Sequence, residues 1–157
     1  MKIIPPHPPF SKGGLGGLGR DIVILGGGDI GCETADMLSS EARKVTIVEM
    51  CKEPLIRMKE IPRQELLTRL KEKGVTIAVT CKAIEIEKGK VIIENKNGLK
   101  QELKADSVII AVGSIPDNAL YHALKDSVKE IYLVGDAQEP GNLGAALRSA
   151  AEVGLKI

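Results

Sequence analysis

Aromatic side chains are almost absent from this sequence of 157 residues, which has no tryptophan and only Phe10, Tyr121 and Tyr132. Proteins that bind single-stranded nucleic acid stack the bases on aromatic rings, and a formal net charge of +1 supplies no basic field for a phosphate backbone. Apolar runs are short as well, and none approaches the roughly 18 residues that a membrane span needs. The sequence therefore predicts neither a nucleic-acid partner nor a membrane partner.

Cysteine and histidine are also scarce. The cysteines Cys32, Cys51 and Cys81 are odd in number and far apart, which is typical of a reduced, cytoplasmic protein rather than a disulfide-stabilised one. No C-x-x-C pair occurs, so we expect no dithiol redox centre and no zinc or iron–sulfur site made by this chain alone. We interpret the three thiols as small buried apolar groups. Neither His7 nor His122 lies in a metal-ligand or catalytic pattern, and no residue of the chain is assigned a catalytic role.

The N-terminal segment 1–19 differs in composition from the rest of the chain. It holds four of the eight prolines and five of the seventeen glycines, a mixture that buries too little apolar surface to offset the entropy of ordering the chain. We predict a disordered tail that adds nothing to the core. We expect no secretory signal, because prolines interrupt the place where its apolar segment would run.

The most informative stretch, from Asp21 to Glu49, is predicted to form a strand, a glycine turn, a helix and a second strand. A G-x-G-x-x-G pattern falls where the first strand passes into the helix. Gly26 permits the tight turn, Gly28 lets a pyrophosphate approach the backbone, and Gly31 lets the helix pack closely on the strand. The helix N-terminus then presents N–H groups to the phosphates. The residues predicted to line this cradle are Gly26, Gly27, Gly28, Asp29, Ile30 and Gly31.

An acidic residue completes the pattern. The second apolar strand, Val45 to Val48, is followed by Glu49, 18 residues beyond Gly31, where a carboxylate can accept the hydroxyls of a ribose. A glycine cluster alone is more often a plain turn between two elements. Here a strand before it, a helix after it, a second strand and an acid at its tip favour a dinucleotide site.

The next part of the chain continues this alternation. We predict a helix from Pro62 to Gly74, whose leucines Leu66, Leu67 and Leu70 are buried and whose basic residues form a solvated face. A third strand, Val75 to Val79, follows. Strands that alternate with helices indicate a parallel sheet with right-handed crossovers.

The spacing of apolar residues then changes to the one typical of short antiparallel strands joined in a meander. Three short runs, Ala83–Glu87, Val91–Asn95 and Gln101–Lys104, are separated by Lys-Gly and Asn-Gly turns. A continuous apolar strand, Val108 to Val112, follows and ends at Gly113. The predicted fold class is therefore α/β, a Rossmann-like parallel sheet with an antiparallel β-meander insertion, of the FAD/NAD(P)-binding type.

Two later phrases make a resemblance specific. The glycine motif, the acidic strand tip and the meander are followed by AVGSIPDN at residues 111–118 and by IYLVGDA at residues 131–137. From about Arg20 to Ile157 the sequence resembles the two-dinucleotide flavoprotein reductases. Within them it is most similar to the C-terminal region of the NADH:flavin oxidoreductase/2,4-dienoyl-CoA reductase family.

The resemblance implies roles for further residues. It implies that the cradle and Glu49 hold NAD(P)H, and that Gly113 marks the crossover between an NAD(P) domain and an FAD domain. Gly135 and Asp136 correspond to the family's flavin motif, in which the acid accepts a hydroxyl of the FAD ribityl chain. The helix beginning near Asn142 would point its N-terminus at the flavin. Its expected core face is Leu143, Ala146, Leu147, Ala150 and Ala151.

The sequence also departs from that family. No second glycine-rich unit precedes the motif, and the substrate barrel and the cysteine-ligated cluster are absent. We therefore interpret the chain as a fragment, with a tail (1–19), an NAD(P)-binding domain (20–115) and the remnant of an FAD-binding domain (116–157). A strand at Ile131–Val134 would lack its sheet, so a plain turn at Gly135–Asp136 stays an equal alternative to a flavin contact. We expect FAD to bind only with a complementary chain or domain.

The functional hypothesis is an oxidoreductase component that binds NAD(P)H and passes hydride to a flavin held partly by a separate flavin-domain chain. The alternative is a nucleotide-binding remnant without independent activity; a methyltransferase-type domain is disfavoured by the meander. Glu49 would repel a 2′-phosphate, and Lys52 is a flexible, solvated point charge, so we expect NAD(H) to be preferred over NADP(H).

Overall fold

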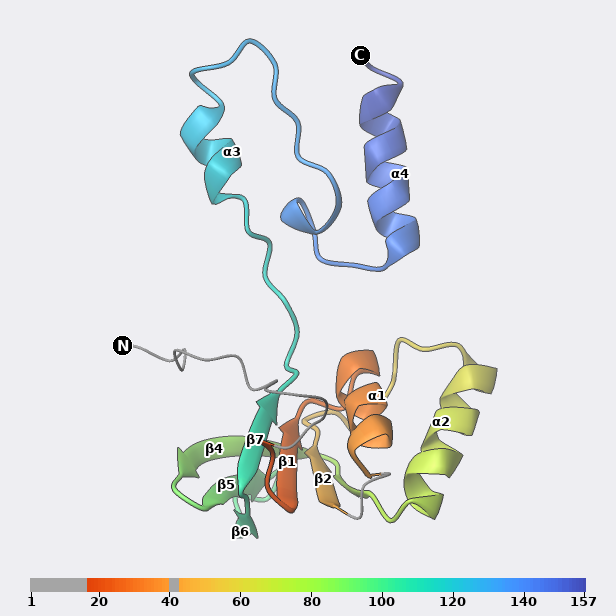
Figure 1. Ribbon diagram of the computed structural model, residues 1–157, viewed down its shortest axis with the longest axis vertical. Coiled ribbons are helices and arrows are strands. Elements are labelled where there is room, and N and C mark those ends of the chain that lie inside the picture. Colours follow the sequence, from red (N-terminus) through yellow and green to blue (C-terminus); the bar gives the residue numbers. More distant parts are fainter. Residues whose placement is uncertain (1–16, 40–42) are drawn as a thin grey trace. The chain divides into compact units, whose positions relative to one another are not determined.

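A computed structural model describes residues 17–39 and 43–157 of the chain. The chain divides at Gly113 into two compact units, one ending at Val112 and one comprising Gly113–Ile157. The two units are described separately below (Figure 1). Most of the predicted tail, residues 1–16, lies outside the described residues.

The first unit is built on a four-stranded parallel sheet. Its strand order is β3-β2-β1-β7, and each neighbouring pair is parallel. The strands are β1 (Asp21–Leu25), β2 (Lys44–Val48), β3 (Thr76–Ala78) and β7 (Ser107–Ile110). The predicted α/β fold class is confirmed, and β7 enters the sheet on the side of β1 away from β2.

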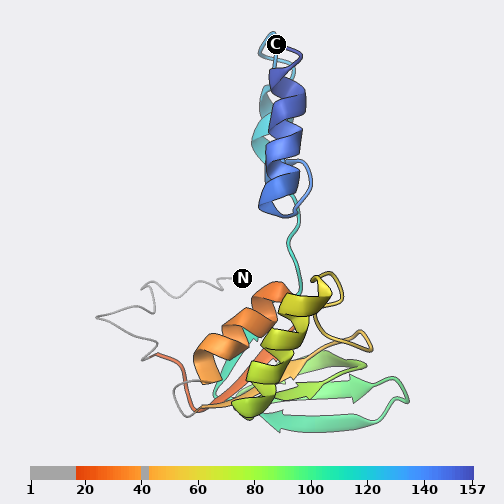
Figure 2. The ribbon, with the colours of Figure 1, turned by 90° about the vertical axis from the view of Figure 1, so that its right-hand side faces the viewer.

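Two helices cover one face of this sheet. Helices α1 (Asp29–Leu38) and α2 (Glu60–Glu72) lie side by side against it, as Figures 1 and 2 show. Helix α2 begins two residues before the predicted Pro62, which occupies its first turn. It ends at Glu72, and Gly74 closes it as predicted, because its φ of +71° lets the Val75 N–H donate to the Leu70 carbonyl oxygen at 2.9 Å.

The core between the helices and the sheet is formed by alternate residues of the strands. In β1 and β2 every second side chain points toward the helices and is buried there, together with Leu66 and Leu70 of α2. These strand residues are Ile22, Ile24, Val45 and Ile47. The predicted leucine stripe of α2 is therefore confirmed for Leu66 and Leu70, whereas Leu67 is only half-buried. The buried strands explain why their sequences are almost continuously apolar.

The predicted solvated face of α2 is only partly correct. The Arg63 side chain is 16% exposed and pairs with Glu53 at 2.6 Å. Lys73 and Arg69 bind the two oxygens of Asp36 on α1 at 2.7 and 3.2 Å. These basic side chains therefore join α2 to its neighbours, although the Arg69 side chain is still 50% exposed.

The antiparallel meander covers the other face of the parallel sheet. It comprises β4 (Cys81–Glu87), β5 (Lys90–Asn95) and β6 (Lys100–Lys104), in the order β4-β5-β6. Val91 and Ile93 of β5 pack with the strand residues that face away from the helices, namely Val23, Leu25 and Val48. The two predicted turns are present. Gly89 and Gly98 have the positive φ angles that such turns require, +84° and +76°.

The last residues assigned to the tail differ from the prediction. Leu18 packs against the helix-side core, and the Gly19 N–H donates to Ser107 Oγ at 3.1 Å. Next along the chain, the N–H groups of Arg20 and Asp21 both donate to Asp106 Oδ2 at 3.0 Å. Leu18 and Gly19 are thus attached to the core and to the first residue of β7, and the prediction that residues 1–19 add nothing to the core is wrong at these positions.

The second unit contains two helices and a 3₁₀ helix but has little core. These are α3 (Ala119–Leu124), η2 (Gly135–Ala137) and α4 (Leu143–Gly154), and none of them contains a buried residue. The predicted helix after Asn142 is confirmed, but its predicted core face is wrong, since Leu143 is 75% and Leu147 62% exposed. Residues Ile131–Val134 form no strand, because a strand needs a partner for its backbone groups.

Candidate functional site

The glycine loop lies at the carboxyl ends of the parallel strands, between β1 and α1. The Gly26 N–H donates to the Val48 carbonyl oxygen at 2.8 Å, and the Ala111 N–H donates to that of Leu25 at 2.7 Å. β1 is flanked by β2 on one side and by β7 on the other. Strand order reverses at this point, and ligands of open α/β sheets bind at such a position.

Two of the glycines are required by the packing of the chain itself. Gly26 has a φ of +107°, and a Cβ there would lie 2.3 Å from the Ala111 carbonyl oxygen. A Cβ at Gly31 would lie 2.0 Å from the Gly26 carbonyl oxygen. These contacts agree with the predicted roles of the two residues in the tight turn and in the close approach of α1 to β1.

Gly28 has no such internal requirement. Its φ of −77° and ψ of −173° are accessible to any residue, and a Cβ there would contact no atom of the chain within 4 Å. Its neighbour Gly27 is buried, whereas Gly28 is exposed. A residue that is glycine without need of backbone freedom or internal space fits a position where something from outside approaches the backbone.

The N-terminus of α1 presents donors beside Gly28. The first helical hydrogen bond runs from the Cys32 N–H to the Gly28 carbonyl oxygen at 3.0 Å, so the preceding N–H groups of Asp29, Ile30 and Gly31 have no intrahelical acceptor. Gly28 itself is the N-cap residue and offers no side chain to them. The side chains of Asp29 and Ile30 are exposed, and their backbone N–H groups are the donors that this helix end offers to a ligand.

Glu49 is held in a defined position at the end of β2. Its Oε2 accepts the Gly27 N–H at 2.5 Å, and its Oε1 accepts the Cys51 N–H at 2.7 Å. Partial burial by itself raises the pKa of the carboxyl, but the hydrogen bonds from Cys51 and Gly27 outweigh it and lower the pKa below its usual value. Glu49 is therefore a charged acceptor beside the glycine loop.

Only one of the three cysteines fits the predicted buried role fully. Cys32 is fully buried, and desolvation, followed by the charges of Glu49, Asp29 and Glu33, raises the pKa of its thiol to about 12. Cys51 is exposed, and its hydrogen bond to Glu49 raises the pKa of its thiol. The sequence analysis missed Cys51 as a contact of the acidic residue.

A further loop residue touches the cradle without any signal in the sequence. The Leu55 N–H donates to the Gly27 carbonyl oxygen at 2.8 Å, and the Leu55 side chain is 1% exposed in the helix-side core. Leu55 has a left-handed φ of +56°, which leucine rarely adopts. No propensity argument would select leucine for that conformation.

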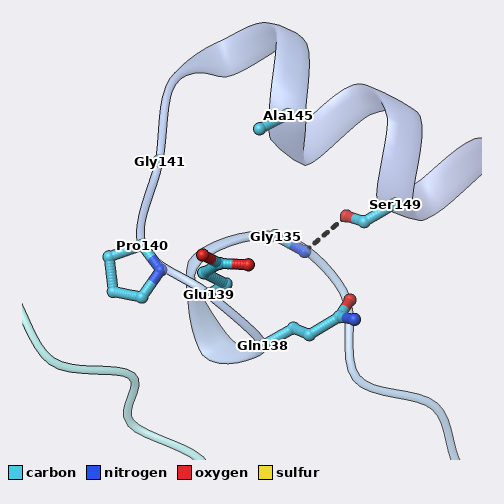
Figure 3. A pocket seen from close by; sticks show the side chains of 7 residues that line it. All are labelled: Gly135, Gln138, Glu139, Pro140, Gly141, Ala145 and Ser149. Carbon is cyan, nitrogen blue, oxygen red and sulfur yellow. Dashed lines mark hydrogen bonds between the residues drawn. The ribbon is translucent and has the colours of Figure 1, made fainter. Parts of the chain in front are cut away.

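The remaining predicted site residues belong to the second unit. Gly113 begins that unit, with a φ of +111°. The Gly135 N–H donates to Ser149 Oγ of α4 at 2.8 Å (Figure 3), and Asp136 Oδ1 accepts the Gly141 N–H at 3.2 Å. This turn lines a hollow of about 240 Å³ together with Gln138, Glu139, Pro140, Gly141, Ala145 and Ser149. Asp136 is not among the lining residues, but the two consecutive flavin-motif residues are held by α4 and by the loop before it.

Comparison with known proteins adds to this geometry. Residues 9–150 match the family model described as pyridine nucleotide-disulphide oxidoreductase. An NADH oxidase from Thermoanaerobacter brockii is 32% identical over 139 residues, which are 88% of this chain and 21% of that protein. A cinnamate reductase from Clostridium sporogenes is 30% identical over 146 residues, covering 89% of this chain and 21% of the relative.

Solved structures agree with the fold. 2-Naphthoyl-CoA reductase superposes with a TM-score of 0.81 at 25% identity, over 89% of this chain and 21% of that one. The chain thus spans 21% of the length of each of these relatives.

No helix among the described residues has the length and apolar character that crossing a membrane requires.

Proposed function

Since the chain belongs to the pyridine nucleotide-disulphide oxidoreductase family, we propose that it binds NADH in the glycine loop and serves as the nicotinamide-dinucleotide component of a flavoprotein reductase. Among the members of this family we place it with the NADH:flavin oxidoreductase/2,4-dienoyl-CoA reductase type. The VTIVEM, LKEKGV and IYLVGDA phrases of the sequence support that narrower assignment. The three free thiols suit the reducing cytoplasm.

The observation that carries the proposal is Gly28. Its backbone conformation suits any residue and a Cβ there meets no atom of the chain, while its exposed peptide lies at the N-terminus of α1. A pyrophosphate would use both features, since it needs close backbone approach and unpaired N–H donors. The residues present therefore fit the dinucleotide that the family implies.

The chain's contribution to the reaction is binding and orientation. When bound, the dihydronicotinamide supplies a hydride to the flavin. The N–H groups of Gly28, Asp29 and Ile30 would hold the phosphates, and Glu49 would accept ribose hydroxyls with the lone pairs that Gly27 and Cys51 leave free. No acid–base residue is needed, because hydride transfer is a property of the two cofactors.

The charge of Glu49 supports NADH over NADPH. The lowered pKa keeps the carboxylate ionised, so a 2′-phosphate would stand beside a fixed anion. Two like charges about 4 Å apart near a protein surface repel by roughly 4 kcal/mol. Lys52 is exposed and has no ion pair among the described residues, so its flexible ammonium would offset only part of that repulsion.

We further propose that the flavin is held largely by another chain or domain. The second unit has the Gly135–Asp136 pair but no second glycine-rich loop. Several large apolar side chains of this unit, among them Leu143 and Leu147, are exposed, which suits a surface that packs against a flavin domain. The alternative, a nucleotide-binding remnant without turnover, shares the glycine loop but needs no such partner.

Two measurements on the purified full chain test this proposal. Titration with NADH, followed by the fluorescence of the dihydronicotinamide, should show saturable binding. Absorbance between 350 and 500 nm should show little bound flavin in the chain alone, and NADH should reduce added FAD only when a complementary flavin domain is present. Absence of NADH binding would contradict the proposed function, whereas NADH binding with no flavin reduction in the reconstituted system would favour the remnant.

A further inference from the structure

Leu55 combines two features that rarely occur together. Its φ of +56° is in the left-handed region, which costs a leucine energy, and its side chain is 1% exposed. The side chain packs in the core cluster that also contains Cys32 and Ala35 of α1. A conformation of this kind persists only where the surrounding structure enforces it, and here the buried side chain supplies the anchor.

The backbone of Leu55 reaches the glycine loop. Its N–H donates to the Gly27 carbonyl oxygen at 2.8 Å, and its own carbonyl oxygen accepts the Met58 N–H at 3.0 Å. The Cys32 thiol also faces the Gly27 carbonyl oxygen, at 3.5 Å. The carbonyl of the Gly27–Gly28 peptide is therefore directed inward, toward α1 and the loop that carries Leu55.

The direction of that carbonyl determines the direction of the next N–H. A trans peptide is planar, so its N–H points opposite to its C=O, and no peptide of the described chain is cis. The Gly28 N–H consequently points away from the core, and it has no acceptor among the described residues. The preceding peptide is fixed as well, because Glu49 accepts the Gly27 N–H.

We propose that Leu55 is a positioning residue for the phosphate cradle. Its buried side chain holds a left-handed backbone whose N–H locks the Gly27–Gly28 peptide, so that the Gly28 N–H faces the approaching pyrophosphate. This inference rests on the proposed function and adds to it a residue that contacts no part of the cofactor. Preorganising a donor in this way strengthens binding, since the peptide need not rotate when the ligand arrives.

The hydrogen bond can be deleted without changing any side chain. Replacing Leu55 by the corresponding α-hydroxy acid converts its amide to an ester and removes the N–H that bonds Gly27. It also weakens the Pro54 carbonyl oxygen, which accepts the Arg63 Nε–H at 3.2 Å, as an acceptor. The matched control is the same replacement at Met58, which removes the neighbouring bond to the Leu55 carbonyl oxygen and leaves Gly27 untouched. Both variants are made in the full chain, and NADH affinity, Tm and the ¹⁵N–¹H resonance of the Gly28 amide are measured.

We expect the Leu55 ester to weaken NADH binding about tenfold, the equivalent of one well-placed hydrogen bond. The Met58 ester should weaken it by less than about threefold at a comparable loss of Tm. The Gly28 amide resonance should shift in the Leu55 ester before any ligand is added, and stay in place in the Met58 ester.

A side-chain pair provides a second comparison. Leu55→Ala and Leu66→Ala each remove a leucine from the same buried cluster and should lower Tm alike, but only Leu55→Ala should weaken NADH binding. Wild-type affinity in the Leu55 ester, or equal losses of affinity in both alanine variants, would overturn the positioning role while leaving the proposed function intact. A wild-type chain that fails to bind NADH would overturn both.

Discussion

Glu49 accepts the Gly27 N–H through Oε2 at 2.5 Å, so the acid at the tip of β2 also holds the glycine loop that follows β1. Its other oxygen accepts the Cys51 N–H at 2.7 Å. One carboxylate thereby joins the glycine loop to the end of β2, the two places proposed to hold the phosphates and the ribose. Its pKa is lowered by these backbone donors, and the negative charge is present throughout the physiological range.

Substitution of Glu49 should change the choice between dinucleotides. We expect the wild-type chain to bind NADH at least about tenfold more tightly than NADPH, because the 2′-phosphate faces an ionised carboxylate. Glu49→Ala should narrow that ratio by weakening NADH binding and relieving the repulsion of NADPH. Paired fluorescence titrations of both dinucleotides at one ionic strength measure the ratio.

Lys52→Ala is the matched comparison for that experiment, since it removes an exposed charge three residues further on. It should widen the ratio only slightly. Tighter binding of NADPH in the wild type, or an unchanged ratio in Glu49→Ala, would show that Glu49 does not select the ribose.

The features that sequence analysis predicted correctly are those determined by short-range pattern. Gly26 and Gly31 are glycines for reasons contained within the loop, and the strand at Val45–Val48 is apolar because both of its faces are covered. The Asn-Gly turn at Gly98 requires a positive φ that glycine supplies. In each case the local structure requires that residue type, so the residue type in turn indicates the structure.

The features that it missed depend on distant parts of the chain. Ile131–Val134 has the composition of a strand but forms none, because no strand among the described residues pairs with it. Leu55 adopts a left-handed φ because of a core contact that its neighbours in sequence do not indicate. Leu18 packs on the core although it belongs to a glycine-rich segment whose composition predicts no packed structure.

Residues 17–19 should contribute measurably to stability. A chain that begins at Arg20 loses the packing of Leu18 and the hydrogen bond from Gly19 to Ser107, whereas a chain that begins at Gly17 keeps both. We expect the shorter chain to be less stable by about 1–2 kcal/mol. Urea unfolding of the two truncated chains measures the difference, and equal midpoints would mean that this segment is not attached to the core.

The ion pairs of Asp36 should make stability depend on pH. The hydrogen bond from Lys73 is the main cause that lowers the pKa of Asp36, and Arg69 adds to it against partial burial. A carboxyl whose folded-state pKa lies below its unfolded value stabilises the fold above the unfolded pKa, and this contribution is lost as pH falls through the folded pKa. Asp36→Asn should therefore destabilise the chain by about 0.5–1 kcal/mol near neutral pH, since these pairs are partly exposed.

The difference in stability between wild type and Asp36→Asn should disappear in acid, once the pH lies below the lowered pKa of Asp36. Glu65→Gln, on the partner helix α2 and without an ion pair among the described residues, is the control and should have little effect at either pH. A difference for Asp36→Asn that persists in acid would assign the loss to packing instead of charge.

The central claim, that the loop at Gly28 receives a dinucleotide, is tested most directly by NADH titration of Gly28→Val. The Cβ of a valine there meets no atom of the chain within 4 Å, and the residue is exposed with an accessible φ, so the variant should fold with a loss of at most about 1 kcal/mol at the N-cap of α1. Its β-branched side chain would occupy the approach of the pyrophosphate. Gly154→Val is the control, because that glycine lies in α4 and a Cβ there also contacts nothing within 4 Å. We predict that Gly28→Val abolishes NADH binding in a chain whose circular dichroism is unchanged, while Gly154→Val binds NADH as the wild type does; wild-type NADH affinity in folded Gly28→Val would contradict the claim.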